Sequence, residues 1–165
     1  MKTKLVAIVL LVTGGLLLSS CDETENDLLK DLAKGKMTVV INDGTPELLT
    51  CNFGTYGEEG SAGEVFIRGS LISSKSDSFF SIMYGSWDNK KALAEKSYST
   101  KNEADMMNVH GSYGYADETY PVTVVITKVS STEIKGTFSG KLKTPDEGVV
   151  DVKGAFWAIP EEAQR

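Results

Sequence analysis

The sequence predicts an all-β protein: a single antiparallel β-sandwich or barrel-like domain, preceded by a signal peptide and a short N-terminal helix or tether. Strand-like runs recur from Lys36 onward, and each run is bounded by Gly, Asn, Asp or Ser residues. With 165 residues, 41% of them hydrophobic, the chain can bury one core and is too short to suggest two. We expect a leader over residues 1–20, a tether and helix over 21–35, the β domain over 36–160, and a tail over 161–165.

The N-terminus has the anatomy of a secretory signal peptide. Met1 to Lys4 is short and positive, Leu5 to Leu18 is apolar apart from Thr13, Gly14 and Gly15, and two small serines follow. The apolar tract is shorter than the about 20 residues that a membrane-spanning helix needs. We therefore expect an exported protein.

The residues Leu18-Ser19-Ser20-Cys21 resemble the lipobox of bacterial lipoproteins. The resemblance covers residues 1–21 and implies that Cys21 receives a diacylglycerol thioether and becomes the first residue of the mature chain. The alternative is a disulfide between Cys21 and Cys51, which an oxidising compartment would permit. Lipidation of Cys21 would exclude that bridge and leave Cys51 as a buried thiol in the apolar run ELLTCNFG.

The mature chain would begin with an acidic segment, DETEND, before leucines at helical spacing. Leu28, Leu29 and Leu32 predict a short amphipathic helix that Gly35 could end. The acidic patch after the cysteine also resembles the surface-export signal of Bacteroidetes-type lipoproteins, which implies the outer membrane and display on the cell surface. The alternatives are a solvated spacer, or the inner-membrane retention that Asp after the cysteine promotes in other Gram-negative bacteria.

The C-terminal third has the clearest strand pattern. In EIKGTFSGKLK every second residue is apolar or glycine, which predicts a strand with one buried and one wet face. A turn over Thr144 to Gly148 leads into GVVDVKGAFWAI. There Trp157 falls on the same face as Asp151 and Lys153, so Trp157 is an exposed aromatic unless a bulge at Gly154 shifts the register.

Three further local predictions concern the middle of the chain. Asn42-Asp43-Gly44 predicts a hairpin turn, because Asp-Gly accepts positive φ angles. The run NKKALAEK, Asn89 to Lys96, predicts a short helix, and GEEGSAGE, Gly57 to Glu64, predicts a mobile loop.

The segment from Val122 to Ile159 resembles small Bacteroidetes lipoproteins whose soluble part is a β-sandwich of unassigned function. This resemblance rests on strand-forming residues and turn glycines, so it implies a fold and a compartment and transfers no site.

Catalytic and metal-binding patterns are sparse. The single histidine, His110, has no G-x-S-x-G nucleophile motif to serve, and a Cys51/His110 pair is separated by about sixty residues. Zinc needs three or four Cys or His ligands, and no EF-hand spacing is present for calcium. We expect no enzyme activity, no metal and no cofactor.

Aromatic residues are the remaining candidates for a binding site. Trp and Tyr on the rim of a β domain can stack against sugars or anchor a protein partner. The candidate binding residues are Trp87, Tyr113, Tyr115 and Trp157. The alternative is that the tyrosines in GSYGYADETY cover the ends of the core.

The sequence therefore predicts a lipid-anchored protein of the cell envelope that acts by binding a protein partner or as a structural accessory. The alternatives are a carbohydrate-binding accessory and, in third place, a hydrolase. Lys2 and Lys4 are the only charged residues before Cys21, so the rest of the chain is more acidic than the net charge of −6 for the whole. That balance argues against a nucleic-acid partner.

Replacing Cys21 tests the anchor. We expect a palmitate label to be incorporated into the wild-type chain and not into Cys21→Ser, because the thioether forms on that sulfur. Two or three acyl chains should hold the protein stably on the membrane, since one chain alone binds only marginally at about 0.8 kcal/mol per buried CH₂. Unlabelled wild-type protein would contradict the prediction.

Overall fold

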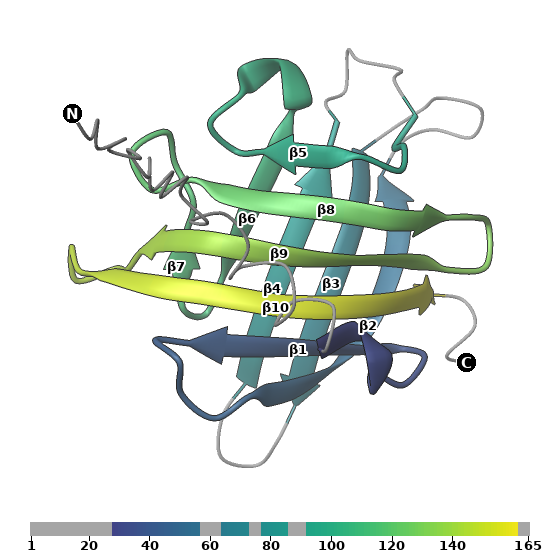
Figure 1. Ribbon diagram of the computed structural model, residues 1–165, viewed down its shortest axis with the longest axis horizontal. Coiled ribbons are helices and arrows are strands. Elements are labelled where there is room, and N and C mark those ends of the chain that lie inside the picture. The colour runs from purple at the N-terminus through teal and green to yellow at the C-terminus, as the bar shows by residue number, and fades with distance from the viewer. Residues whose placement is uncertain (1–27, 57–63, 73–76, 86–91, 162–165) are drawn as a thin grey trace, which may run out of the picture.

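The computed structural model describes residues 28–56, 64–72, 77–85 and 92–161, and these form a β-barrel-like domain (Figure 1). The all-β prediction is confirmed. The described residues contain ten strands and one 3₁₀ turn, η1 (Glu103–Asp105). The strands are β1 (Lys36–Ile41), β2 (Glu47–Tyr56), β3 (Glu64–Ile72), β4 (Asp77–Tyr84), β5 (Ser97–Ser99), β6 (Met107–Gly111), β7 (Gly114–Tyr115), β8 (Val122–Val129), β9 (Ile134–Lys143) and β10 (Val149–Pro160).

The strands form one sheet that closes on itself. β1 pairs with β10 on one side and with β2 on the other, and the sheet continues through β3, β4 and β6. The short strand β7 pairs with both β6 and the end of β9, and β9 pairs with β10, which completes the circuit. β8 and β5 extend the sheet from the other edge of β9. In Figure 1, β5, β8, β9, β10 and β1 lie in front, and β3, β4 and β6 cross behind them.

The β9–β10 hairpin settles the position of Trp157. Its register is continuous from the pair of Lys143 with Val149 to the pair of Ile134 with Ala158. Gly154 therefore carries no bulge, and Trp157 lies on the outer face, as the unbroken alternation predicts. A register shift is found instead in β8, between Ile126 and Lys128.

Aromatic rings join the two layers inside the barrel. Phe80 of β4 stacks on Phe138 of β9 with ring centroids 4.5 Å apart, and Phe138 stacks on Phe156 of β10 at 6.5 Å. All three side chains are fully buried. A Cβ on Gly154 would lie only 2.4 Å from the Phe138 ring, so a glycine is needed beneath it.

The β1–β2 turn is a hairpin turn, as predicted, but the residues with positive φ are not the predicted pair. Asn42 and Asp43 take φ angles of 48° and 54°, and the Gly44 amide donates to the Ile41 carbonyl over 2.8 Å. The Asn42 side chain also accepts a hydrogen bond from the Asp151 amide of β10. That bond fixes Asn42 in the turn, so Asn-Asp takes the place expected of Asp-Gly.

In the β9–β10 turn the positive φ belongs to Glu147, at 66°, and not to the neighbouring Gly148. The turn itself is as predicted: the Glu147 amide donates to the Thr144 carbonyl, and the Thr144 amide donates to the Gly148 carbonyl.

The helix predicted over residues 89–96 is wrong in its described part, because residues 92–96 are not helical. Tertiary contacts override the local pattern there. Leu93 is buried in the core cluster, and the Tyr98 hydroxyl bonds to both the amide and the carbonyl of Ala94. These contacts take backbone groups that a helix would use.

At the N-terminus, residues 28–30 are helical and Gly35 joins the chain to the barrel. The Gly35 amide donates to the Trp157 carbonyl, and its own carbonyl accepts from the Cys51 amide, both over 2.8 Å. The predicted mobile loop over Gly57–Glu64 falls, up to residue 63, outside the described residues, as do the leader and residues 21–27. No helix in the described part of the chain is long and apolar enough to cross a membrane.

The ring stack gives a stability prediction. Phe138→Ala should lower the free energy of unfolding by about 3–5 kcal/mol, because it removes a fully buried ring and leaves a cavity. Phe79→Ala, on the outer face of β4, is the matched control, and it should lower the free energy of unfolding by clearly less. Urea denaturation of both variants measures the difference, and equal losses would contradict this account of the core.

Candidate functional site

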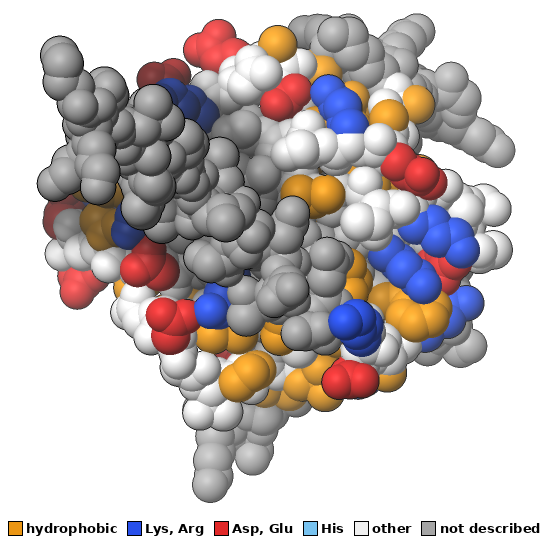
Figure 2. All heavy atoms as spheres, in the orientation of Figure 1, with side chains coloured by type: hydrophobic (Ala, Val, Ile, Leu, Met, Phe, Trp, Pro, Cys, Tyr) orange, Lys and Arg blue, Asp and Glu red, His pale blue; other side chains and the backbone are white. Residues whose placement is uncertain are grey.

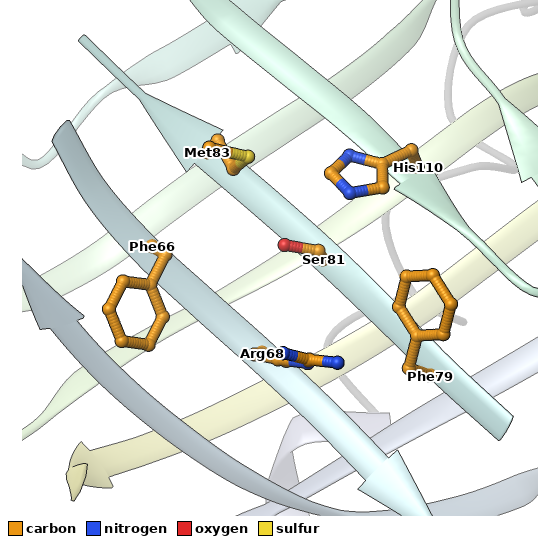
Figure 3. Close-up of a pocket in the computed structure, with 6 residues that line it drawn as sticks. All are labelled: Phe66, Arg68, Phe79, Ser81, Met83 and His110. Carbon is orange, nitrogen blue, oxygen red and sulfur yellow. The ribbon is translucent and has the colours of Figure 1, made fainter. Parts of the chain in front are cut away.

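A depression of about 240 Å³ lies on the outer face of the sheet, over β3, β4 and β6 (Figure 3). Six residues line it: Phe66, Arg68, Phe79, Ser81, Met83 and His110. The depression combines an open hollow with apolar, aromatic and cationic side chains, so we take it as the candidate functional site.

Strand alternation places these side chains outside the barrel. In β3 and β4 the intervening residues Ile67, Phe80 and Ile82 are buried in the core, so their neighbours must point outward. Arg68 pairs in register with Ser81, and Ser81 pairs with His110, so the three residues form a row across the strands. The chain thereby joins residues more than forty positions apart into one surface.

The apolar wall depends on a glycine in the next strand. Gly54 of β2 pairs with Phe66, and a Cβ on Gly54 would lie 2.5 Å from the Phe66 ring. The missing side chain lets the ring lie over β2, where Phe66 is only 6% exposed. Ser81 is equally buried and is the smallest of the lining residues, so it forms the floor of the depression.

Phe79 holds the polar groups of the site. The Arg68 guanidinium carbon lies 5.3 Å from the centre of the Phe79 ring, within the range of a cation–π contact. The His110 ring meets Phe79 edge-on, with centroids 6.0 Å apart. Arg68 forms no ion pair with an acid in the described part of the chain. The guanidinium therefore brings a positive charge, which no acid among the described residues pairs with, and several N–H donors to the rim.

Tyr115, a candidate from the sequence, lies beside this site. It pairs in register with His110 and is 44% exposed, so it extends the row of Arg68, Ser81 and His110 along the outer face. Tyr113 lies differently: it packs against the core cluster, and its buried hydroxyl has no hydrogen-bond partner among the described residues. The two tyrosines are therefore not brought together as one binding surface.

Trp157 lies in a different, enclosed setting on the outer face of β10. The Lys135 ammonium sits 3.3 Å from the ring centroid, and the indole N–H donates to Glu133 over 2.6 Å. Glu133 is also ion-paired with Lys128. Figure 2 shows blue basic side chains beside an apolar patch where β8 ends and β9 begins. One face of the indole is thus already covered by a cation.

The Lys128 ammonium, through its hydrogen bond to the carboxylate, lowers the pKa of Glu133, and the bond from Trp157 acts in the same direction. Burial opposes this shift, since the Glu133 side chain is only 11% exposed. In the cluster of Trp157, Lys135, Glu133 and Lys128, the indole N–H and the carboxylate therefore already have partners.

Two sequence candidates, Cys21 and Trp87, lie outside the described residues. Cys51 lies in the core, where burial raises the pKa of its thiol, and it faces away from His110 on the outside of the sheet. Within the described ranges no three His, Cys, Asp or Glu side chains converge to hold a metal ion.

None of the six residues that line the depression is among the binding candidates from the sequence. His110 alone was considered there, as a catalytic residue. The signal was present in EVFIRGSLIS and DSFFSIMYGS, where strict alternation leaves Phe66, Phe79 and Met83 on the wet face. Apolar residues on that face would have marked it as a contact surface.

No protein-family model, no curated protein and no solved structure matches this chain. Its function is therefore argued from its own residues.

The Glu133 cluster predicts a pH dependence of stability. Because the folded-state pKa of Glu133 lies below its ordinary value, its ion pair contributes above that ordinary value and is lost as the pH falls through the folded-state pKa. The melting temperature of the wild type should exceed that of Glu133→Gln at neutral pH, and the gap should close in acid. Other carboxylates are common to both proteins and cancel.

A Lys128→Gln background is the control for this cluster. In that background the same Glu133→Gln change should lower the melting temperature at neutral pH by less, because the partner of the ion pair is already absent. A gap that is independent of both pH and Lys128 would contradict the assignment.

Proposed function

We propose that this chain is a lipid-anchored protein of the bacterial cell envelope that binds a partner protein through the outer face of β3, β4 and β6, without catalysing a reaction. The observation that carries the binding role is the depression itself. Phe66, Phe79 and Met83 line it together with an arginine that has no acidic partner among the described residues. The lipobox-like leader and Cys21 support the anchor.

The residue types favour a protein partner. Aromatic residues, Met and Arg are enriched at protein interfaces, and a few such residues usually supply most of the binding energy. At about 240 Å³ the depression is smaller than the roughly 300–1,000 Å³ of sites that enclose a whole small ligand. A hollow of this size suits one side chain projecting from a larger partner.

The tether keeps the domain close to the membrane. Gly35 is hydrogen-bonded to the barrel, so the chain between a lipidated Cys21 and the domain is short. Even fully extended, fourteen residues reach roughly 50 Å. The partner would therefore be another envelope component near the same membrane, and the acidic segment after Cys21 favours the outer membrane and its outer face.

A carbohydrate partner is less well supported. Sugar rings stack on exposed aromatic faces, and the Lys135 ammonium already covers one face of Trp157. A sugar on that face would have to displace the cation. Binding to a glycan array that disappears on replacing Trp87 or Trp157 would reverse this preference.

Site-specific cross-linking in intact cells tests the proposal. A photo-reactive phenylalanine analogue at Phe79 should give a discrete adduct with one envelope protein, because this ring lies in the depression. The matched control places the same analogue at Val149, which is 40% exposed and lies outside the depression.

The adduct from position 79 should also be lost when Arg68 is changed to Glu, since the reversed charge would repel the group that Arg68 attracts. Equal adducts from positions 79 and 149, or none from position 79, would contradict the proposal.

A further inference from the structure

We propose that the depression holds the C-terminal residue of the partner chain: its carboxylate on the Arg68 guanidinium, and its apolar side chain against Phe66 and Met83 above Ser81. This inference rests on the proposed function and deepens it by naming the group that is bound. The charge of the site, its apolar walls and its size each support this inference.

The charge selects an anion. Arg68 carries a cationic guanidinium and has no ion pair with an acid within the described ranges. Its contact with the Phe79 ring fixes the guanidinium at the rim of the hollow. A planar guanidinium can give a carboxylate two parallel hydrogen bonds, and His110, on the other side of Ser81, adds ring N–H donor capacity.

The walls require an apolar body on the same ligand. Phe66, Phe79 and Met83 line the hollow, so a ligand that fills it must present apolar surface as well as a carboxylate. The side chains of Asp and Glu carry only one or two methylene groups. A C-terminal Leu, Phe or similar residue carries both features on one α-carbon, with the carboxylate and the apolar side chain pointing apart.

The size and openness favour a chain end over a free acid. A volume of about 240 Å³ corresponds to about eight water molecules at about 30 Å³ each. Free ligands are usually enclosed over most of their surface, whereas this hollow opens on the outside of a sheet (Figure 3). The preceding residues of a partner chain could leave through that opening and pass over Tyr115, the neighbour of His110 in register.

Ligand-observed NMR titration of the purified full chain in detergent micelles tests the inference, with empty micelles as the blank. The probes are N-acetyl-phenylalanine, its C-terminal amide, and 3-phenylpropionate, which is an acid without the peptide unit. We expect N-acetyl-phenylalanine to bind at least about tenfold more tightly than the amide, because only the acid can pair with Arg68 through a charge-assisted hydrogen bond.

Two variants and one control make the test specific. Arg68→Gln should weaken binding of the acid by about tenfold and remove the preference over the amide. Ser81→Leu should abolish saturable binding by filling the floor, and circular dichroism checks that this variant remains folded. Lys101→Gln removes an exposed cation from the turn after β5 and should change nothing.

Equal binding of acid and amide, or binding of the acid that is indifferent to Arg68, would overturn the inference. Tighter binding of 3-phenylpropionate than of N-acetyl-phenylalanine would also overturn it, in favour of a free acid. None of these three results would affect the cross-link from position 79 in cells. If that cross-link were absent while N-acetyl-phenylalanine still bound, only the proposed function would be overturned.

Discussion

The stacking of Phe80, Phe138 and Phe156 across the barrel is the interaction on which the rest of the structure depends. The three rings come from β4, β9 and β10, so they hold the crossing layers together at one point. Gly154 permits the stack, since any side chain there would collide with the Phe138 ring. Once these rings fill the interior, the pleat of each strand decides which residues remain outside.

The candidate site is the outer counterpart of this core. Because Phe80 and Ile82 point inward, Phe79, Ser81 and Met83 of the same strand must point outward, and the same rule places Phe66 and Arg68 outside on β3. Phe79 and Met83 are only half-buried on this outer face and lie outside the ring stack that fills the barrel. The grouping of apolar and aromatic side chains with a cation that has no acidic partner in the described part of the chain is therefore better explained by binding than by folding. The cluster at Trp157 shows the contrast, since its indole and its carboxylate already have partners within the cluster.

Much of the fold could be predicted from the sequence because period-two alternation is a local property. The strand from Ile134 to Lys143 follows from it, and so does the outward position of Trp157 once the register shows no bulge at Gly154. Both hairpin turns follow instead from the residue types in the turns. The residue that takes positive φ in each turn did not follow, because the contact of Asn42 with Asp151 depends on a strand more than a hundred residues away. The helix expected up to Lys96 does not form for the same reason, since the Tyr98 hydroxyl and the burial of Leu93 hold that segment in another conformation.

The site could be predicted only in part. Alternation marks Phe66 and Phe79 as outward, but only the register of β3, β4 and β6 brings Arg68, Ser81 and His110 into one row.

We propose the outer face of β3, β4 and β6 as the binding surface of this protein. Mapping the backbone amide shifts of the full chain on addition of N-acetyl-phenylalanine tests this proposal, because every described strand reports separately. We expect the largest changes at the residues that line the depression, from Phe66 to His110, and small changes along β8 and β10. Largest changes around Trp157 and Lys135, or changes spread evenly over the barrel, would contradict it.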